Sequence, residues 1–135
     1  MAKQYSLNKN EKLKSRKQLN ELFAGGKPFL VFPVKIFFHL NDAVEKPAVK
    51  MGAGASKKYF RLAVHRNRVK RLLRETYRLN KLPLLNFAMK EKKDISIFFL
   101  YVDREIVEYT VLNDKMKKII EKFIKLNTFS EEAGV

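Results

Sequence analysis

The sequence contains no cysteine. This absence excludes disulfide bonds, thiolate zinc sites, iron–sulfur clusters and a cysteine nucleophile, and it fits a reducing compartment. Long hydrophobic runs are also missing, since the longest covers residues 95–102 and is interrupted by Ser96, whereas a membrane span needs about 20 residues. The polar amino terminus lacks the apolar segment of a secretory signal. We therefore expect a cytoplasmic protein with no membrane partner.

Acidic residues are scarce. The chain has 29 Lys and Arg against 14 Asp and Glu, a net charge of +15 and an isoelectric point near 10.1. The net charge is +6 in residues 1–40, +10 in residues 41–90 and −1 in residues 91–135. We therefore expect a polyanionic partner that binds the first two thirds of the chain, while the last third resembles an ordinary structural segment.

A length of 135 residues with 46% hydrophobic residues suits one domain with a hydrophobic core and excludes global disorder. We expect a single RNA-binding domain over residues 1–135, with an ordered core at about 7–126 and flexible ends. Hydrophobic periodicity predicts an α+β fold in which helices back one sheet. The predicted helices cover residues 16–24, 63–80 and 115–126, and the predicted strands cover residues 31–40, 48–56 and 94–102.

Two details of these elements are also predicted. Pro83 is expected to end the helix at 63–80, and Asn113 or Asp114 is expected to cap the last helix. Gly52 and Gly54 weaken the strand prediction for residues 48–56, because glycine lowers strand propensity.

The densest feature is the basic segment at residues 57–81, which carries ten Lys and Arg and one acidic residue, Glu75. Arg66, Lys70 and Arg74 follow one another at four-residue spacing along one flank of the predicted helix. Like charges at this spacing destabilise an isolated helix by about 0.2–0.5 kcal/mol per pair, and phosphates would offset the repulsion. We predict a surface that binds the phosphates of a nucleic acid, formed by Lys57, Lys58, Arg61, Arg66, Asn67, Arg68, Lys70, Arg71 and Arg74. Asn67 either caps the helix or contacts a base or ribose.

Aromatic residues lie among lysines in the first forty residues. Unpaired bases stack on such rings, but most of these phenylalanines are expected in the core. Phe37 shares its predicted strand face with Lys35 and His39, so it faces either RNA or the core, whereas alternation places Phe38 in the core.

Protein-borne catalysis has little support in the sequence. His39 and His65 lack metal-ligand spacing, and no Walker, G-x-S-x-G, H-E-x-x-H or paired-carboxylate motif occurs. Asp103, Glu105 and Glu108 offer only a weak case for a metal nuclease. We expect no catalytic residue and no small-molecule substrate, and leave any protein-side metal ligands unassigned.

Two strings resemble the protein component of bacterial ribonuclease P. They are Gly52-x-x-x-Ser56-Lys57-Lys58 and, seven residues later, Arg66-Asn67-Arg68-Val69-Lys70-Arg71-Leu72-Leu73-Arg74-Glu75. The segment Leu13-Lys14-Ser15-Arg16, with Phe23 and Gly26 beyond it, is similar to that family as well. The resemblance covers about residues 7–126, and its second string is the specific part.

The resemblance implies an α-β-β-β-α-β-α fold with a left-handed βαβ crossover. It implies the protein subunit of a ribonucleoprotein in which a catalytic RNA with bound Mg²⁺ removes the 5′ leader from precursor tRNA. It also implies a leader cleft between the first helix and the sheet, formed here by Lys12, Arg16, Leu19, Phe23 and Phe37 or Phe38. Leu19 departs from the aromatic residue common in the family, and Ala53-Gly54-Ala55 is smaller than the usual apolar strand.

Three other functions stay open at this point. The chain could be a non-catalytic RNA-binding module such as a ribosome-associated protein, a stand-alone nuclease, or a protein bound to an anionic membrane surface. The last is disfavoured because the apolar stripe of the basic helix is needed for the core.

Overall fold

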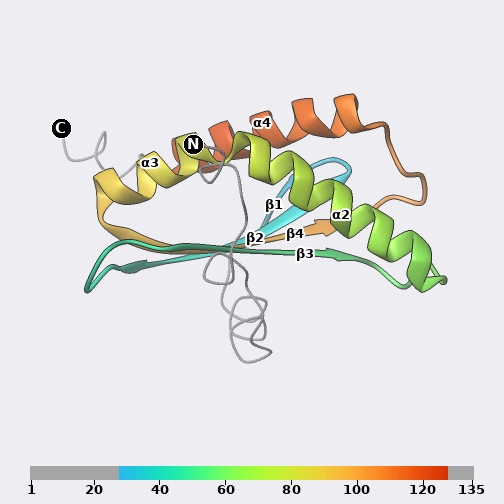
Figure 1. Cartoon of the computed structure of the whole chain (residues 1–135), viewed down its shortest axis with the longest axis horizontal. Helices are drawn as coiled ribbons and strands as arrows, with labels where there is room; N and C mark the ends of the chain where they lie inside the picture. The colour runs from blue at the N-terminus through green and yellow to red at the C-terminus, as the bar shows by residue number, and fades with distance from the viewer. Residues whose placement is uncertain (1–27, 128–135) are drawn as a thin grey trace.

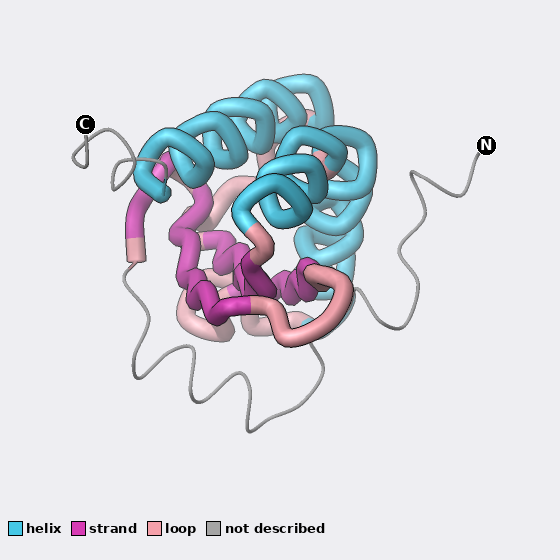
Figure 2. Tube along the Cα trace, turned by 90° about the vertical axis from the view of Figure 1, so that its left-hand side faces the viewer, coloured by secondary structure: helices cyan, strands magenta, loops and turns pink. Residues whose placement is uncertain are grey.

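The computed structural model describes residues 28–127, which form a four-stranded sheet with three helices on one of its faces (Figures 1 and 2). The mixed α+β class is therefore confirmed. The predicted helix at 16–24 lies outside the described residues. The elements are β1 (Phe29–Val31), β2 (Val34–Asp42), β3 (Val49–Ala55), α2 (Ala63–Asn80), α3 (Leu82–Glu91), β4 (Lys93–Tyr101) and α4 (Tyr109–Asn127).

The strands lie in the order β1-β2-β4-β3. β2 is antiparallel to both β1 and β4, whereas β3 is parallel to β4 and is joined to it through α2 and α3. The three strands before α2 agree with the order that the family resemblance implies. The left hand of the β3–β4 crossover stays a prediction of that resemblance.

The strand predicted at residues 31–40 is two strands. The chain turns at Phe32 and Pro33 and then returns as β2. Pro33 has no N–H to donate to a strand ladder, so a continuous central strand through this position is unfavourable. Its carbonyl instead accepts a hydrogen bond of 2.8 Å from the N–H of Val102.

The core lies between the sheet and the helices. Ile36 of β2 and Ile97 and Phe99 of β4 are fully buried, as are Leu73 of α2 and Phe123 of α4. Each such side chain contributes about 1.5–3 kcal/mol by leaving water. Because side chains alternate along a strand, the intervening residues of β2 and β4 occupy the opposite face of the sheet, which we call the outer sheet face.

The α2 helix begins and ends at the predicted residues, but Pro83 does not stop the helical region. α2 ends at Asn80, and α3 starts at Leu82 after a single intervening residue. Pro83 lies in the first turn of α3, where its missing N–H costs no helical hydrogen bond. α3 was not predicted, because its ten residues are too few for a clear periodic pattern.

The α4 helix begins at Tyr109, six residues before the predicted start. The predicted cap is wrong, because Asn113 and Asp114 lie inside the helix. Leu112 is fully buried, so an earlier helix start gains core contact, and the side-chain oxygen of Asn113 accepts a 2.7 Å hydrogen bond from the Asn80 amide. The strands predicted at 48–56 and 94–102 match β3 and β4 to within one residue at each end. Within residues 28–127, no helix is both long and apolar enough to span a bilayer.

Candidate nucleic-acid interface

A short turn places the first two candidate cations at the end of β3. The Ser56 carbonyl accepts hydrogen bonds from the N–H groups of Tyr59 (3.2 Å) and Phe60 (3.0 Å), and its hydroxyl accepts one from the N–H of Lys58 (3.2 Å). Phe60 is buried and anchors the turn to the core. Lys57 and Lys58 are therefore held at the exposed surface of this turn.

Arg66 holds the same turn from the side of α2. One guanidinium nitrogen of Arg66 donates to the carbonyls of Phe60 (2.7 Å) and Arg61 (2.9 Å). The helix has no side-chain cap at Leu62, and this contact helps to tie the preceding loop to the first turns of α2. Arg66 was predicted as an RNA contact, and the structure adds a structural role for it.

The exposed side of α2 presents most of the other predicted cations. Asn67, Arg68 and Arg71 are exposed, and Lys70 and Arg74 are half-buried. The first turn of α2 contains no acidic residue. Because the helix begins at Ala63 after Leu62, the alternative in which Asn67 caps the helix is wrong.

Two basic residues of the segment do not add free charge to this surface. Arg78 forms an ion pair of 3.2 Å with Glu75. Lys81 is 1% exposed at the junction between α2 and α3. We define the α2 basic surface as the exposed or half-buried cations Lys57, Lys58, Arg61, Lys70, Arg68, Arg71 and Arg74 together with Asn67.

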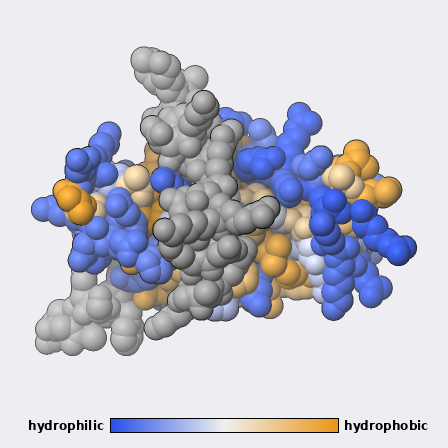
Figure 3. Space-filling view, turned by 90° about the horizontal axis from the view of Figure 1, so that it is seen from below, coloured by the Kyte–Doolittle hydropathy of each residue, from blue (hydrophilic) through white to orange (hydrophobic). Residues whose placement is uncertain are grey.

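Apolar side chains lie within the α2 basic surface. Leu62 and Val64 are 59% and 66% exposed, and Val64, His65, Asn67, Arg68 and Arg71 line a hollow of about 550 Å³. Figure 3 shows hydrophilic side chains, with some hydrophobic atoms among them, at the end of the molecule where β3 leads into α2. Cations beside exposed apolar groups suit a nucleotide, which has a charged phosphate and a flat base.

The outer sheet face carries a second candidate surface. Phe37, Phe98 and Leu100 form a separate hydrophobic cluster there, and the Lys35 ammonium lies 5.3 Å from the centre of the Phe37 ring. Phe37 pairs with Phe98 across β2 and β4. A ring next to a cation can stack on a base while the cation pairs with its phosphate.

Phe38 lies on the opposite face of the sheet. Its ring makes edge-to-face contacts with Phe29 and Phe123, at centroid distances of 5.8 and 5.0 Å. Of the two phenylalanines predicted for the leader cleft, Phe37 is therefore the one on the outer sheet face. The other predicted cleft residues, Lys12, Arg16, Leu19 and Phe23, lie outside the described residues.

The small residues of β3 have a packing role that the sequence did not reveal. A Cβ atom at Gly54 would lie 2.8 Å from the Phe98 ring. The glycine therefore makes room for Phe98 on the outer sheet face, and Phe98 itself was missed as a candidate. Alternation along β4 was the signal that could have found it, because it puts Phe98 and Leu100 on the face opposite Phe99.

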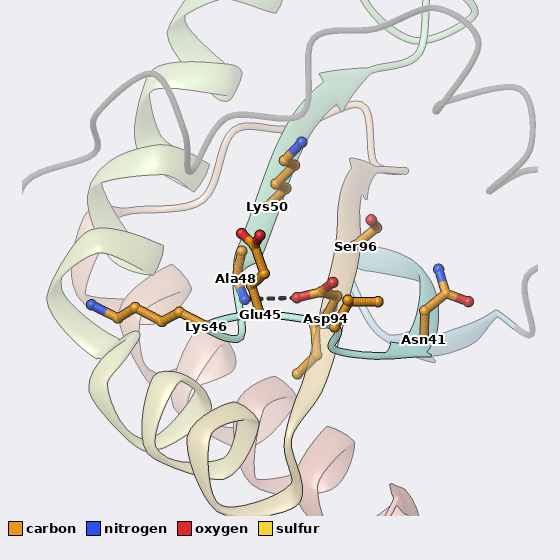
Figure 4. A pocket seen from close by; sticks show the side chains of 9 residues that line it. Asn41, Glu45, Lys46, Ala48, Lys50, Asp94 and Ser96 are labelled. Atoms are coloured by element: carbon orange, nitrogen blue, oxygen red, sulfur yellow. Dashed lines mark hydrogen bonds between the residues drawn. The ribbon is translucent and has the colours of Figure 1, made fainter.

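A hollow of about 450 Å³ lies at the β2–β3 turn (Figure 4). Its lining mixes both charges, with Glu45 and Asp94 beside Lys46 and Lys50. Asp94 accepts a 2.9 Å hydrogen bond from the N–H of Ala48. The two carboxylates would repel a phosphate, so we leave this hollow out of the candidate nucleic-acid interface.

The carboxylates considered for a nuclease site belong to the β4–α4 loop. The Tyr101 hydroxyl organises this loop by donating to the Glu105 carbonyl (2.6 Å) and accepting from the N–H of Val107 (3.0 Å). Burial, with smaller effects from Asp103 and Glu105, raises the pKa of Tyr101. Within the described part of the chain, no three His, Asp or Glu side chains are grouped so as to hold a metal ion.

Comparison with known proteins supplies the family. The family model described as Ribonuclease P matches residues 7–124. The ribonuclease P protein component of Porphyromonas gingivalis is 38% identical over 115 residues, which cover 84% of this chain and 83% of the relative. That of Chlorobium phaeobacteroides is 34% identical over 100 residues, with 72% and 68% covered.

Solved structures share the fold. The ribonuclease P protein of Thermotoga maritima superposes with a TM-score of 0.63 at 20% identity, over 83% of this chain and 96% of that one. The ribonuclease P protein of Staphylococcus aureus superposes with a TM-score of 0.58 at 20% identity, over 89% and 93%. With the family model matching most of its length, this chain belongs to the ribonuclease P protein family.

Proposed function

We propose that this chain is the protein subunit of the ribonuclease P ribonucleoprotein, and that it binds the catalytic RNA through the α2 basic surface. The observation that carries the proposal is the charge of that surface: its cations come from one helix and the turn before it, and the only acidic residue of the segment, Glu75, pairs with Arg78. Arginine forks and lysine ammonium groups are the standard protein contacts to RNA phosphates.

In this proposal, the outer sheet face binds the 5′ leader of precursor tRNA. Phe37 supplies a half-buried ring on which an unpaired base can stack, the buried Phe98 supports it from β4, and Lys35 supplies a cation over the Phe37 ring. Each stacked base would contribute about 1–3 kcal/mol. Because mature tRNA has no leader, this contact would favour the precursor over the product.

The proposal assigns cleavage to the RNA subunit, with Mg²⁺ bound mainly by that RNA and by the substrate. The chain's own side chains then bind and orient the two RNAs and break no bond. We expect the subunit and its RNA to act in the cytoplasm.

The test is cleavage of labelled precursor tRNA at low Mg²⁺ by the protein alone, the cognate ribonuclease P RNA alone, and both together. Accurate 5′ cleavage only in the combined sample is the expected result. Cleavage by the protein alone would overturn the assignment of chemistry to the RNA. Tight binding of the RNA without any gain in cleavage would instead favour the non-catalytic RNA-binding module.

Two double variants test whether RNA binding depends on the α2 basic surface. Arg68→Ala with Arg71→Ala should weaken binding of the ribonuclease P RNA, and the loss should shrink as salt is raised. Lys46→Ala with Lys90→Ala removes the same charge from exposed positions elsewhere and should change binding little. Equal losses in the two double variants would mean that net charge, and not this surface, governs binding.

Arg66 needs a separate variant, because it holds the turn before α2. Arg66→Lys keeps the charge but cannot reproduce the paired contact with the Phe60 and Arg61 carbonyls. We expect Arg66→Lys to weaken RNA binding by loosening the Lys57–Lys58 turn, which faster amide exchange at Tyr59 and Phe60 would report. Unchanged exchange with weaker binding would make Arg66 a direct RNA contact only.

A further inference from the structure

The α4 helix carries a row of lysines that the regional charge of the sequence conceals. Lys115, Lys118 and Lys122 follow at spacings of three and four residues, which places them on one side of the helix, and we call them the α4 lysine row. The net charge of −1 in residues 91–135 arises because most acidic residues there lie outside α4. Inside α4, five lysines stand against Asp114 and Glu121. The expectation that basic surface is confined to the first two thirds of the chain is therefore incomplete.

Lys115, Lys118 and Lys122 form no ion pair with a carboxylate of residues 28–127. Asp114 and Glu121 form no ion pair there, since the ion pairs within residues 28–127 are Arg78–Glu75 and Lys93–Asp42. Lys118 and Lys122 are exposed and Lys115 is half-buried. Cations four residues apart repel one another on a helix, so an anionic partner would stabilise this arrangement.

The row faces the edge of the molecule opposite the α2 basic surface. The Lys122 ammonium lies 5.4 Å from the centre of the Phe29 ring in β1, and α4 packs beside β1. α2 packs instead against β3, and β1 and β3 are the two edge strands of the sheet. Figures 1 and 2 show the two helices side by side on the same face of the sheet. A single RNA helix lying along α2 would therefore leave the lysine row uncovered.

We propose that the α4 lysine row is a second RNA-binding surface, which contacts phosphates of an RNA segment different from the one bound by the α2 basic surface. This inference rests on the proposed function, which supplies an RNA partner large enough to reach both edges. Lysine ammonium groups suit it because they pair with phosphates as point charges and need no fixed geometry. The protein would then hold two RNA segments at a set separation.

A membrane surface fits the row less well. Met116, Ile119 and Phe123 of α4 are fully buried in the core, so the helix has no free apolar face to enter a bilayer. The exposed apolar residues nearest this edge, Leu30 and Phe32, belong to the β1–β2 hairpin and are 52% and 55% exposed. Exposed rings and aliphatic side chains next to cations are suited to nucleotides as well as phosphates.

The test uses the full chain with Lys115→Gln, Lys118→Gln and Lys122→Gln combined. The matched control combines Lys46→Gln, Lys90→Gln and Lys117→Gln, which removes the same charge from exposed positions, one of them on another side of α4. Affinities for the ribonuclease P RNA and for precursor tRNA are measured separately over a range of KCl, together with hydroxyl-radical footprints. Changing the three row lysines to arginine should keep binding, and a thermal melt checks that each variant folds.

For one of the two RNAs, we expect the row variant to reduce the slope of log affinity against log salt by about 2–3. Each phosphate contact releases about 0.7–0.9 counterions on binding, so the loss of three contacts lowers the slope by that amount. The control should leave the slope nearly unchanged. The nucleotides that lose protection should differ from those that lose protection with Arg68→Ala and Arg71→Ala. The RNA that responds identifies the source of the phosphates.

Three outcomes would overturn the inference. The row and control variants could behave alike on both RNAs while Arg68→Ala with Arg71→Ala loses affinity, which would leave the proposed function intact. The row variant could lose the same footprint as the α2 variant. The row variant could also bind both RNAs normally but no longer sediment with vesicles containing phosphatidylserine, to which the original chain binds. That result would assign the row to a membrane. If the α2 variant also bound normally, the proposed function itself would fail.

Discussion

The two faces of the sheet use the same strands for different purposes. On the face covered by the helices, β2 and β4 place Ile36, Ile97 and Phe99 in a fully buried core. On the outer sheet face, the alternate positions hold Phe37 and Phe98 beside the cation of Lys35. The comparison teaches that one residue of register separates a core side chain from one on the outer sheet face, as the neighbours Phe37 and Phe38 illustrate.

The largest expected effect comes from the covered face. Phe99 is fully buried and packs against Tyr77 with 5.6 Å between ring centres. Phe99→Ala should lower the free energy of unfolding by about 3–5 kcal/mol, through lost burial and the cavity left behind. Urea unfolding followed by circular dichroism measures this. Where the variant is still folded, it should bind precursor tRNA normally. A selective loss of leader binding would contradict the assignment of the covered face to stability alone.

The next effect concerns function on the outer sheet face. Phe37→Ala should reduce the preference for precursor over mature tRNA by about 1–3 kcal/mol, the contribution of one stacked base. The measurement is the ratio of holoenzyme affinities for the two tRNAs. Phe38→Ala is the matched control, since its ring packs on Phe29 and Phe123. If Phe38→Ala lowered the preference as strongly in folded protein, the assignment of the two faces would be wrong.

A third prediction joins packing to the outer sheet face. Gly54→Ala brings a Cβ atom to within 2.8 Å of the Phe98 ring, so that ring must move. We expect a loss of about 1–3 kcal/mol in unfolding free energy, as for other overpacked sites. Combining it with Phe98→Leu should relieve part of the loss in a double-mutant cycle. Strict additivity would show that the ring does not limit the site.

The smallest expected effect is a pH dependence at the edge of the covered face. Folding raises the pKa of Tyr101 above its ordinary value of 10.0, chiefly through burial. The neutral hydroxyl is thus favoured in the folded state. Its contribution to the free energy of unfolding is therefore fully present below about pH 10 and is lost as the pH rises through the raised pKa. Unfolding free energies from pH 8 to 11 should fall less steeply in Tyr101→Phe than in the original chain. If the unfolding free energy fell equally steeply with pH in both proteins, Tyr101 would not be a cause of the pH dependence.

Several elements of the fold could be predicted from the local sequence pattern. The α2 boundaries, the β3 and β4 strands and the basic segment follow from periodicity and charge, because each is a property of neighbouring residues. The α3 helix, the β1 hairpin and the early start of α4 escaped prediction. Their stability comes from distant contacts, such as Asn80 with Asn113 and Pro33 with Val102.

The candidate site likewise has features that the sequence predicted and features that only the structure shows. Residue types and spacing by themselves identified the cations of α2, the family resemblance and the alternation that separates Phe37 from Phe38. Only the tertiary structure decided that Arg66 holds a turn, that Lys81 is buried, that Gly54 accommodates Phe98 and that the lysines of α4 face the opposite edge from α2. Composition and periodicity describe each element alone, whereas burial and hydrogen-bond partners depend on which elements the fold brings together.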